Sequence, residues 1–573
     1  MQDKTKIRRQ LRALRQRLLS PGLWLWLTPL LLLIPNIGLT VTETYAPLAK
    51  TANLVLPAGV YLLLMTLTRR TGRVMLWLTP LMVLCAFQIV LLFLYGESII
   101  AIDMFMNVMT TNVGEATELL ANLKGAIVVV CLLYVPVIGM GVYFVRAHRF
   151  AGEAELRQTR RAGLWLTGFG ILVFVAALLW SDGFSPRREM FPYNVCANLV
   201  SSVERKREAL HYGESSATFS YRAESTHADT LPEVYVFVIG ETSRADNWQL
   251  MGYGRPTNPR LSQQRGVTAY SRTLSEVNTT HKSVPMLLSW LTADTFGSGV
   301  GRTRSIFEAF NSAGYATAFI SNQRRNHSYI DFYGREAQHV EFISDSAGPQ
   351  RDANLLGPLD TFLAKAGRRK AFVVLHTYGS HFEYNKRYGR EMAVFRPDGK
   401  SAADVANRAE LLNAYDNTIV YTDSVLSAGI DRLRASRRVA AMIYVSDHGE
   451  DIFDDARGRF LHASPVPTYW QLHVPMIVWT SDEFGRAYPR KAAAIAAHRD
   501  ADVSSTASVF HTLMDMAGLR SPYWRAGLSL ASDTYRAPAR RYLNDYNESV
   551  PLSASGLRAS DFSAMRRAGI RYD

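Results

Sequence analysis

Several apolar stretches in the second half of the chain are followed at once by side chains that commonly bind metal ions. The stretches and the residues behind them are VYVFVIG (234–240) with Glu241, KAFVVLH (370–376) with His381, and VAAMIYV (439–445) with Asp447, His448 and, further on, His462. Carboxylates and imidazoles together form the ligand set of zinc or manganese. If the fold brings these residues together, the chain holds a metal site.

The elements that would position these residues are short apolar strands that alternate with helical stretches from about Pro232 onward. The candidate strands are 234–240, 316–322, 370–379, 439–447 and 474–481. Strands that are apolar throughout are covered on both faces, so we expect a three-layer α/β domain with a mostly parallel sheet. Ligands of such sheets bind at the carboxyl ends of the strands, where Glu241, Asp447 and His448 would lie.

Each residue also has a purely structural interpretation. An Asp-His pair after a strand is often a helix cap with a satisfied histidine, and Glu241 could cap the helix behind its strand. The histidines of HTYGSH (376–381) could merely cap loops. We expect Thr242 to cap the next helix, whose N-terminus favours anions, rather than to act as a nucleophile. The joint occurrence of these residues at one predicted edge favours a metal site.

The first 180 positions of this 573-residue chain contain long apolar runs with almost no charges. Five runs approach the ~20 residues that cross a hydrocarbon core. They are 23–41, 54–68, 74–95, 126–145 and 164–180, the second extending back toward Ala52. The first run is too long, and is followed by too many others, to be a cleaved signal peptide. We therefore expect a five-helix transmembrane domain over residues 1–182.

Lysine and arginine in the loops predict the orientation. The N-terminal stretch KTKIRRQLRALRQR and the loops behind the second and fourth runs are basic, whereas the opposite loops carry only Lys50 and Lys124. The N-terminus is therefore expected in the cytoplasm, and five crossings place the domain over 232–573 outside. Much of the net charge of +14 is thus a topology signal, which argues against nucleic-acid binding.

Two segments are expected at the membrane surface. The external loop 96–124 is amphipathic and too polar to cross. It is either a connector helix or part of a site, because Asn107, Thr111 and Glu115 would form one polar stripe on a helix. Residues 183–231 mix aromatic with basic residues, which suits interfacial helices followed by an irregular linker.

The motifs of the chain resemble those of bacterial phosphoethanolamine transferases of the alkaline-phosphatase and sulfatase superfamily. The similar segments are GETSRADNWQLMGYGRPTNPRL, VNTTHKSVPMLLSWL, LHTYGSHFEYNKRY and YVSDHGE, in the family's order and at family-like spacing. Five spans before an external domain also match that family, so the resemblance covers nearly the whole chain.

The resemblance implies a role for each candidate residue. The implied zinc ligands are Glu241, Thr280, Asp447 and His448. Thr280 in NTTHKSVP is the implied nucleophile, and its neighbour Thr279 is the second choice. The residues implied to contact phosphate or a second zinc ion are His381 and His462, and those implied to bind a lipid headgroup are Asn107, Thr111 and Glu115.

The implied reaction has two steps. Thr280, activated by the metal, attacks the phosphorus of phosphatidylethanolamine, releases diacylglycerol and keeps the phosphoethanolamine. An acceptor then attacks in turn, while His381 or His462 shuttles the proton. Lipid A, the lipopolysaccharide core and another periplasmic glycan are all open as acceptors. The resemblance places the chain, as a monomer, in the bacterial inner membrane with a periplasmic catalytic domain.

Two departures from the best-known lipid A enzymes concern the outer domain. Those enzymes carry several disulfides, one beside the nucleophile, whereas here Glu276 and Met286 stand in those places and no cysteine follows Cys196. A basic segment that helps hold substrate reads SNQRRNHS here, and its candidate substitutes are Arg324, Arg325 and His327. These departures leave the acceptor open.

Three other functions share parts of this pattern. A sulfatase needs a cysteine or serine converted to formylglycine, and the outer half lacks cysteine. A phosphoglycerol transferase of the lipoteichoic acid synthase type also has five spans and a threonine nucleophile, and it stays as the enzymatic alternative. A metal-free envelope scaffold is the non-enzymatic alternative, although the intact candidate metal ligands disfavour it.

Overall fold

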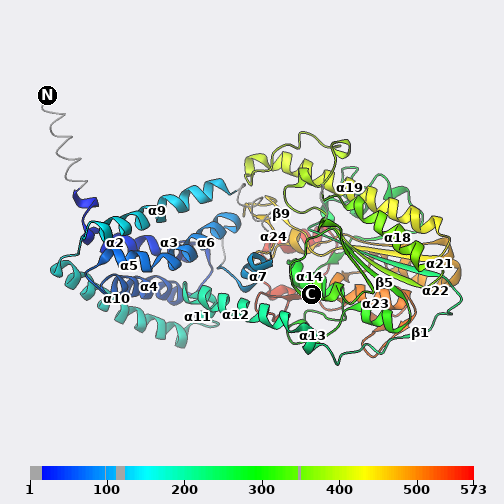
Figure 1. Ribbon diagram of the computed structural model, residues 1–573, viewed down its shortest axis with the longest axis horizontal. Helices are drawn as coiled ribbons and strands as arrows, with labels where there is room; N and C mark the ends of the chain where they lie inside the picture. Colours follow the sequence, from blue (N-terminus) through cyan, green and yellow to red (C-terminus); the bar gives the residue numbers. More distant parts are fainter. Residues whose placement is uncertain (1–15, 97–98, 111–122, 346–349, 573) are drawn as a thin grey trace. The chain divides into compact units, whose positions relative to one another are not determined.

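The computed structural model describes residues 16–96, 99–110, 123–345 and 350–572 (Figure 1). These residues divide into two compact units. The first contains the described residues up to Phe105 together with Leu123–Ser201, and the second contains the others. The domain boundaries expected at 182 and 231 stay a prediction.

Apolar helices dominate the first unit. They are α2 (Pro21–Leu32), α3 (Ile34–Thr42), α4 (Pro47–Met65), α5 (Thr71–Trp77), α6 (Thr79–Tyr95), α9 (Lys124–Arg146) and α10 (Glu153–Trp180). Within the described residues, four segments are long and apolar enough to cross a membrane: α2 with α3, α4, α9 and α10. The bent pair of α5 and α6 makes a fifth if it counts as one span.

Proline explains where two of the expected spans break. Leu78 separates α5 from α6, which are bent by 51° relative to each other, and Pro80 lies in the first turn of α6. Leu33 separates α2 from α3, and Pro35 lies in the first turn of α3. Proline lacks an N–H and clashes with the preceding turn, so it suits the start of a helix better than its interior.

A seven-stranded sheet forms the centre of the second unit (Figure 1). In spatial order its strands are β3 (Val267–Tyr270), β11 (Met476–Thr480), β8 (Val439–Ser446), β2 (Glu233–Gly240), β7 (Ala371–His376), β5 (Ala316–Ser321) and β6 (His339–Phe342). The five strands from β8 to β6 run parallel, whereas β11 is antiparallel to both neighbours. The expected mostly parallel sheet is confirmed.

Helices cover both faces of the sheet (Figure 1). Those on one face include α14 (Thr280–Leu287), α16 (Ile306–Ser312) and α23 (Ser505–Met516), and those on the other are α18 (Leu356–Ala366) and α19 (Arg408–Ala435). In β2, Tyr235, Phe237 and Ile239 pack toward the first set, and Val234, Val236 and Val238 pack toward the second. Since successive side chains of a strand alternate between faces, two covering layers require a strand that is apolar throughout.

Short elements complete the described part of the chain. The paired strands are β1 (Glu224–Ser225) with β13 (Leu519–Arg520), β4 (Thr273–Leu274) with β12 (Val503–Ser504), β9 (Asp451–Ile452) with β10 (Phe460–Leu461), and β14 (Arg541–Leu543) with β15 (Ser549–Pro551). The other helices are α7 (Ile102–Thr110), α11 (Pro186–Glu189), α12 (Tyr193–Leu210), α13 (Tyr212–Ser215), α15 (Phe296–Gly299), α17 (Tyr329–Gly334), α20 (Tyr469–Leu472), α21 (Asp482–Ala487), α22 (Pro489–Ala497) and α24 (Ala559–Arg567).

Candidate metal centre and nucleophile

Glu241 lies at the end of β2, in the middle of the sheet, and its side chain is buried. The hydroxyl of Thr242 donates to Glu241 Oε1 at 2.8 Å, and Gln323 Nε2 donates to Oε2 at 2.9 Å. Thr280 Oγ1 lies 3.2 Å from Oε1. The loop after β7 closes over this residue at Gly379, which has a φ of 52°. A Cβ on Gly379 would stand 2.6 Å from the carbonyl oxygen of Glu241, so the close approach requires glycine.

Asp447 and His448 follow β8, the neighbour of β2, and both are buried. Asp447 Oδ1 accepts the backbone N–H groups of Thr242 and His448 at 3.1 and 2.8 Å. Asp447 Oδ2 has no hydrogen-bond partner within the described residues. His448 Nδ1 lies 2.9 Å from the carbonyl oxygen of Gly449. Because a carbonyl only accepts, the neutral ring keeps its proton on Nδ1 and presents the lone pair of Nε2.

Thr280 is the first residue of α14, and its Oγ1 lies 3.0 Å from His448 Nε2. The first turn of a helix has backbone N–H groups without intrahelical partners, which favours an anion beside Thr280. Thr279 precedes the helix as an extended, buried residue. Its hydroxyl has no hydrogen-bond partner in the described part of the chain. This geometry favours Thr280 over Thr279 as the nucleophile.

The candidate ligand atoms of Thr280, Asp447 and Glu241 all lie close to His448 Nε2. His448 Nε2 lies 3.0 Å from Thr280 Oγ1, 3.3 Å from Asp447 Oδ2 and 3.6 Å from Glu241 Oε1. Ligands of a tetrahedral zinc ion with bonds of about 2 Å stand about 3.3 Å apart, and these three separations are close to that value. Burial and the adjacent Asp447 carboxylate raise the pKa of Glu241 to about 7. A dication would relieve this repulsion between two buried carboxylates.

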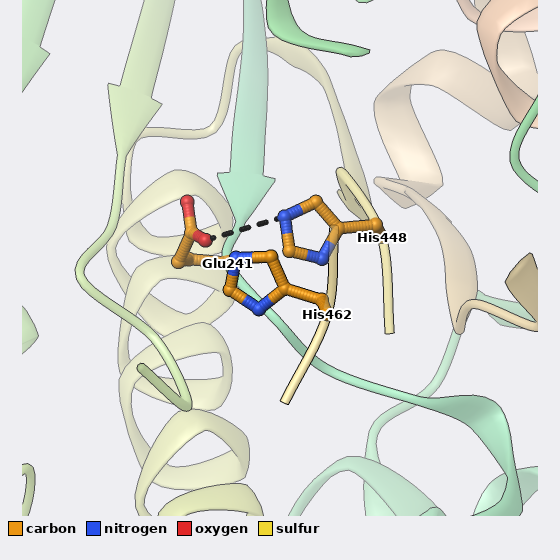
Figure 2. A group of neighbouring side chains, drawn as sticks. All are labelled: Glu241, His448 and His462. Carbon is orange, nitrogen blue, oxygen red and sulfur yellow. Dashed lines mark ion pairs between the residues drawn. The ribbon is translucent and has the colours of Figure 1, made fainter. Parts of the chain in front are cut away.

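His462 follows β10, and its ring lies tilted by 38° beside that of His448, with centroids 4.1 Å apart. Figure 2 shows both imidazoles next to the Glu241 carboxylate, and these three side chains each offer a ligand atom within 4.8 Å of the others. His462 Nδ1 lies 3.4 Å from Glu450 Oε2, and the Tyr384 hydroxyl donates to the other oxygen of Glu450. Burial, with the nearby charges of His448 and His381, lowers the pKa of His462 well below its ordinary value.

His381 lies in the loop after β7, close enough for its charge to act on Glu241 and His462. Its ring lies beside Tyr378, with centroids 5.1 Å apart. His381 Nδ1 is buried and has no hydrogen-bond partner among the residues that the structure describes. A buried polar atom without a protein partner is a place where a substrate group or an ion would bind.

Thr242 does not cap a helix, and that expectation is wrong. The residue has a φ of 59°, and only a three-residue 3₁₀ turn, Ala245–Asn247, follows. The Ser243 N–H bonds to the hydroxyl of Ser446 at 2.8 Å, so the chain turns toward β8 instead of starting an α-helix. The helix N-terminus at this site belongs to α14.

Gln323 is a site residue that the sequence pattern does not indicate. Besides Glu241, its Nε2 contacts the Thr377 carbonyl oxygen at 3.0 Å. The sequence could indicate Gln323 only through its position just after the strand expected over 316–322, at the sheet edge where Glu241 lies. The three substitutes named for this segment, Arg324, Arg325 and His327, are all exposed. Arg325 lies over the ring of Phe342 at 4.6 Å.

Asn107, on α7, is placed beside the nucleophile segment. Its Oδ1 lies 3.1 Å from Nδ1 of His281, the residue after Thr280. Thr111 and Glu115, expected on the same stripe, lie outside the described residues.

Glu276 and Met286, which stand where the resembled enzymes carry a disulfide, are both buried. Glu276 Oε2 accepts the hydroxyl of Thr506 at 2.9 Å and the N–H of Ala293 at 3.2 Å. Met286 packs in an apolar cluster. The hydrogen bond from Thr506 therefore links Glu276, just ahead of the nucleophile, to α23.

Comparison with known proteins identifies a family and a relative. Residues 233–519, half of the chain, match the family model described as Sulfatase. A curated relative is the Kdo(2)-lipid A phosphoethanolamine 7''-transferase of Escherichia coli (strain K12), which is 28% identical over 314 residues. The match covers 53% of this chain and 54% of that relative, so the chain spans about half the length of the curated relative.

Two solved structures share the fold. One is the integral membrane protein lipooligosaccharide phosphoethanolamine transferase A (EptA) from Neisseria meningitidis, with a TM-score of 0.70 and 20% identity over 89% of this chain and 99% of that chain. The other is the C-terminal periplasmic domain of EcEptC from Escherichia coli in complex with Zn, with a TM-score of 0.52 and 23% identity over 57% of this chain and 94% of that chain. Apolar N-terminal helices followed by an α/β domain are therefore confirmed as the architecture.

Proposed function

The chain belongs to the sulfatase family, and on that premise we propose that it transfers phosphoethanolamine from phosphatidylethanolamine to an envelope glycolipid. Lipid A and the lipopolysaccharide core are the favoured acceptors, because a relative is named for transfer to Kdo(2)-lipid A. The observation that carries the proposal is the Thr280 hydroxyl, 3.0 Å from His448 and 3.2 Å from Glu241 at the start of a helix.

The first proposed step forms a covalent intermediate on the protein. Thr280 Oγ1 attacks the phosphorus of phosphatidylethanolamine, and the bond between phosphorus and the diacylglycerol oxygen breaks. Phosphoethanolamine stays on Oγ1, and the threonine proton ends on diacylglycerol, carried by His381 or His462. The backbone N–H groups at the start of α14 face the negative charge that develops on the phosphoryl oxygens.

The second proposed step transfers phosphoethanolamine from Thr280 to the acceptor. An acceptor hydroxyl or phosphate oxygen attacks the same phosphorus, the bond to Thr280 Oγ1 breaks, and Oγ1 regains a proton. Two half-reactions allow the lipid donor to leave before a bulky acceptor arrives. Asn107, 3.1 Å from His281, is proposed to contact the donor headgroup, together with Thr111 and Glu115.

Glu241, Thr280, Asp447 and His448 would hold a zinc ion. Support comes from the unpartnered oxygen of Asp447, the lone pair of His448 Nε2 and the fold shared with a domain solved with Zn. Such an ion, when bound, lowers the pKa of the threonine hydroxyl and offsets charge on the phosphoryl group. A second ion would use His381 and His462.

The same proposal places the chain in the inner membrane, with a cytoplasmic N-terminus, a periplasmic second unit and a monomeric state. Neither alternative function is favoured. The relatives reported above are named for phosphoethanolamine rather than phosphoglycerol. A metal-free scaffold would not need four convergent ligand atoms at a strand edge.

Mass spectrometry of envelope lipids and glycans tests the transfer. Cells with the wild-type chain should contain an envelope molecule that carries an extra phosphoethanolamine, and cells with Thr280→Ala should lack it. Identical profiles under conditions in which both chains are present would contradict the proposal. The mass of the adduct trapped on Thr280 separates phosphoethanolamine from phosphoglycerol.

A further inference from the structure

A basic pocket of about 170 Å³ lies between α5 and the end of α9 in the first unit. Four of its lining side chains are cationic or can become so, and they are Arg70, Arg73, His148 and Arg149. Phe144 and Phe150 contribute apolar walls, and the lining contains no carboxylate. None of these residues belongs to the candidate metal centre.

Close helix packing forms one end of the pocket. A Cβ on Gly72 of α5 would stand 2.6 Å from the carbonyl oxygen of Gly141 and 2.8 Å from Cβ of Phe144, both on α9. Small residues allow two helices to approach this closely. This close packing fixes the positions of Phe144 and of Arg73, the residue after Gly72, in the pocket lining.

The loop behind α9 is folded back over the same pocket. His148 adopts a φ of 48°, and the N–H of Arg149 donates to the carbonyl oxygen of Phe144 at 3.0 Å. The N–H of Ala151 donates to the carbonyl oxygen of Arg69 at 3.1 Å, which fastens this loop to the start of α5. Arg149 is thus brought next to Arg70 and Arg73 by ordered backbone.

No carboxylate among the residues that the structure describes neutralises the arginines of the pocket. Within the described residues, the side chains of Arg70, Arg73 and Arg149 make no ion pair or hydrogen bond. In contrast, Arg69, which does not line the pocket, pairs with Glu153 at 2.9 Å. Three guanidinium groups around one concavity repel one another unless an anion lies between them.

We propose that this pocket binds the phosphate group of an anionic phospholipid from the cytoplasmic leaflet. Arginine matches phosphate oxygens with paired N–H donors, and the exposed ring of Phe150 suits the glycerol and upper acyl segments. The basic loops that supply these residues are the ones expected on the cytoplasmic side, where basic pockets between helices bind anionic headgroups. Without an acidic lining residue, the pocket offers nothing to the ammonium group of a zwitterionic lipid.

Native mass spectrometry of the full chain in detergent, titrated with single lipids, tests the proposal. Detergent removes the surface potential of a bilayer, so only local binding is measured. Phosphatidylglycerol should bind more tightly than phosphatidylethanolamine or phosphatidylcholine. R70Q/R73Q/R149Q should weaken phosphatidylglycerol binding by about fivefold for each arginine removed. The matched control R157Q/R160Q/R161Q removes the same charge from α10 outside the pocket and should change binding less than about twofold.

Three results would overturn the proposal: equal weakening in both triple variants, equal affinity for the anionic and zwitterionic lipids, or displacement of the lipid by inorganic phosphate alone at the lipid's own concentration. The single variants Arg73→Gln and Arg149→Gln keep the test decisive if the triple variant fails to insert, because each leaves the other loop arginines in place. Each should weaken phosphatidylglycerol binding about fivefold, and unchanged binding in both would also exclude the site.

Discussion

At the scale of single residues, two adjacent threonines differ in what their hydroxyls reach. Thr280 Oγ1 lies beside Glu241 and His448, whereas Thr279 is buried ahead of the helix. We expect Thr280→Ala to reduce transfer of labelled phosphoethanolamine by the purified full chain at least about a thousandfold, because it removes the nucleophile. Thr279→Val removes a buried hydroxyl that has no hydrogen-bond partner in the described residues, and should stay within about tenfold of wild type. An adduct that persists in Thr280→Ala and disappears in Thr279→Val would reverse the assignment.

Gln323 orients the carboxylate of Glu241 through a 2.9 Å hydrogen bond. Gln323→Glu would place a second carboxylate against that of Glu241. We expect this substitution to change the affinity for zinc as well as the position of Glu241. Gln323→Met removes the hydrogen bond at similar volume and should lower zinc affinity about tenfold to a hundredfold, as the loss of an outer partner of a ligand does. Competition with a chromogenic chelator measures both variants, and unchanged affinity in Gln323→Met would contradict this role.

Glu276 should make folding stability depend on pH. Burial raises its pKa to about 7 from an ordinary value of 4.5. Between these values the unfolded chain loses the proton while the folded chain keeps it, so this residue reduces stability as pH rises toward 7. Glu276→Gln can still accept from Thr506 and Ala293, and its thermal midpoint should gain on the wild type from pH 5 to pH 8. A difference in midpoint that is equal at both pH values would show that Glu276 does not retain its proton in the fold.

The sequence predicts these residues unequally. Glu241, Asp447 and His448 follow apolar strands directly, so strand pattern alone places them at one edge of the sheet. Gln323 also follows a strand, but glutamine is not a typical metal ligand, and its role depends on a contact with Glu241 across the sheet. The expectation of a helix cap at Thr242 rests on the rule that a helix usually follows a parallel strand, whereas here the chain turns toward Ser446.

At the scale of elements, the C-terminal segment from β14 onward supports the nucleophile loop, although it contains no recognisable motif. The Tyr542 hydroxyl donates to Asn278 Oδ1 at 3.0 Å, and Asn278 Nδ2 reaches Gln471 Oε1 at 2.6 Å. Arg457, in the loop between β9 and β10, forms a bidentate pair with Asp561 of α24 at 2.9 and 2.6 Å. These contacts join residues far apart in the chain, so no local pattern predicts them.

Tyr542→Phe tests this support. It keeps the ring in its apolar cluster, removes the hydrogen bond and leaves buried Asn278 with one partner fewer, at a cost of about 1–3 kcal/mol in unfolding free energy. Because Asn278 is close to Thr280 in the chain, we expect kcat to fall about tenfold or more with little change in KM. Tyr572→Phe is the control, since that hydroxyl contacts only the side chain of Arg566, at 2.8 Å, in the described residues. Equal kinetic effects in both variants would remove the specific role of Tyr542.

Apolar runs predict where the membrane helices lie, but not where each helix begins or breaks. Hydropathy locates the apolar stretches well, but it does not report that Pro80 and Pro35 start new helices. α4 begins at Pro47, well before the run expected from Leu54. Hydropathy misses these first turns because they include Lys50 and other residues of low hydropathy. The number of spans therefore depends on how α5 and α6 are counted.

At the scale of the whole molecule, the number of membrane crossings decides on which side of the membrane the proposed catalytic unit lies. Five crossings put the two ends of the chain on opposite sides, whereas a re-entrant pair of α5 and α6 would leave four crossings and both ends together. The arginine-rich loops favour five, because the loop between α9 and α10 then shares the cytoplasmic side with the N-terminal basic stretch. That loop region carries Arg146, Arg149, Arg157, Arg160 and Arg161, and four crossings would place it outside.

Reporter fusions after Arg73, after Tyr95 and after Asp573 separate the two topologies. Green fluorescent protein should fluoresce after Arg73 in either case. Alkaline phosphatase, which needs disulfides formed outside the cytoplasm, should be active after Tyr95 and after Asp573 only if α5 and α6 cross the membrane once. A fluorescent fusion after Tyr95 would mean that the bent pair returns to the side it came from. The second unit would then be cytoplasmic, away from lipopolysaccharide, and the proposed transfer could not occur.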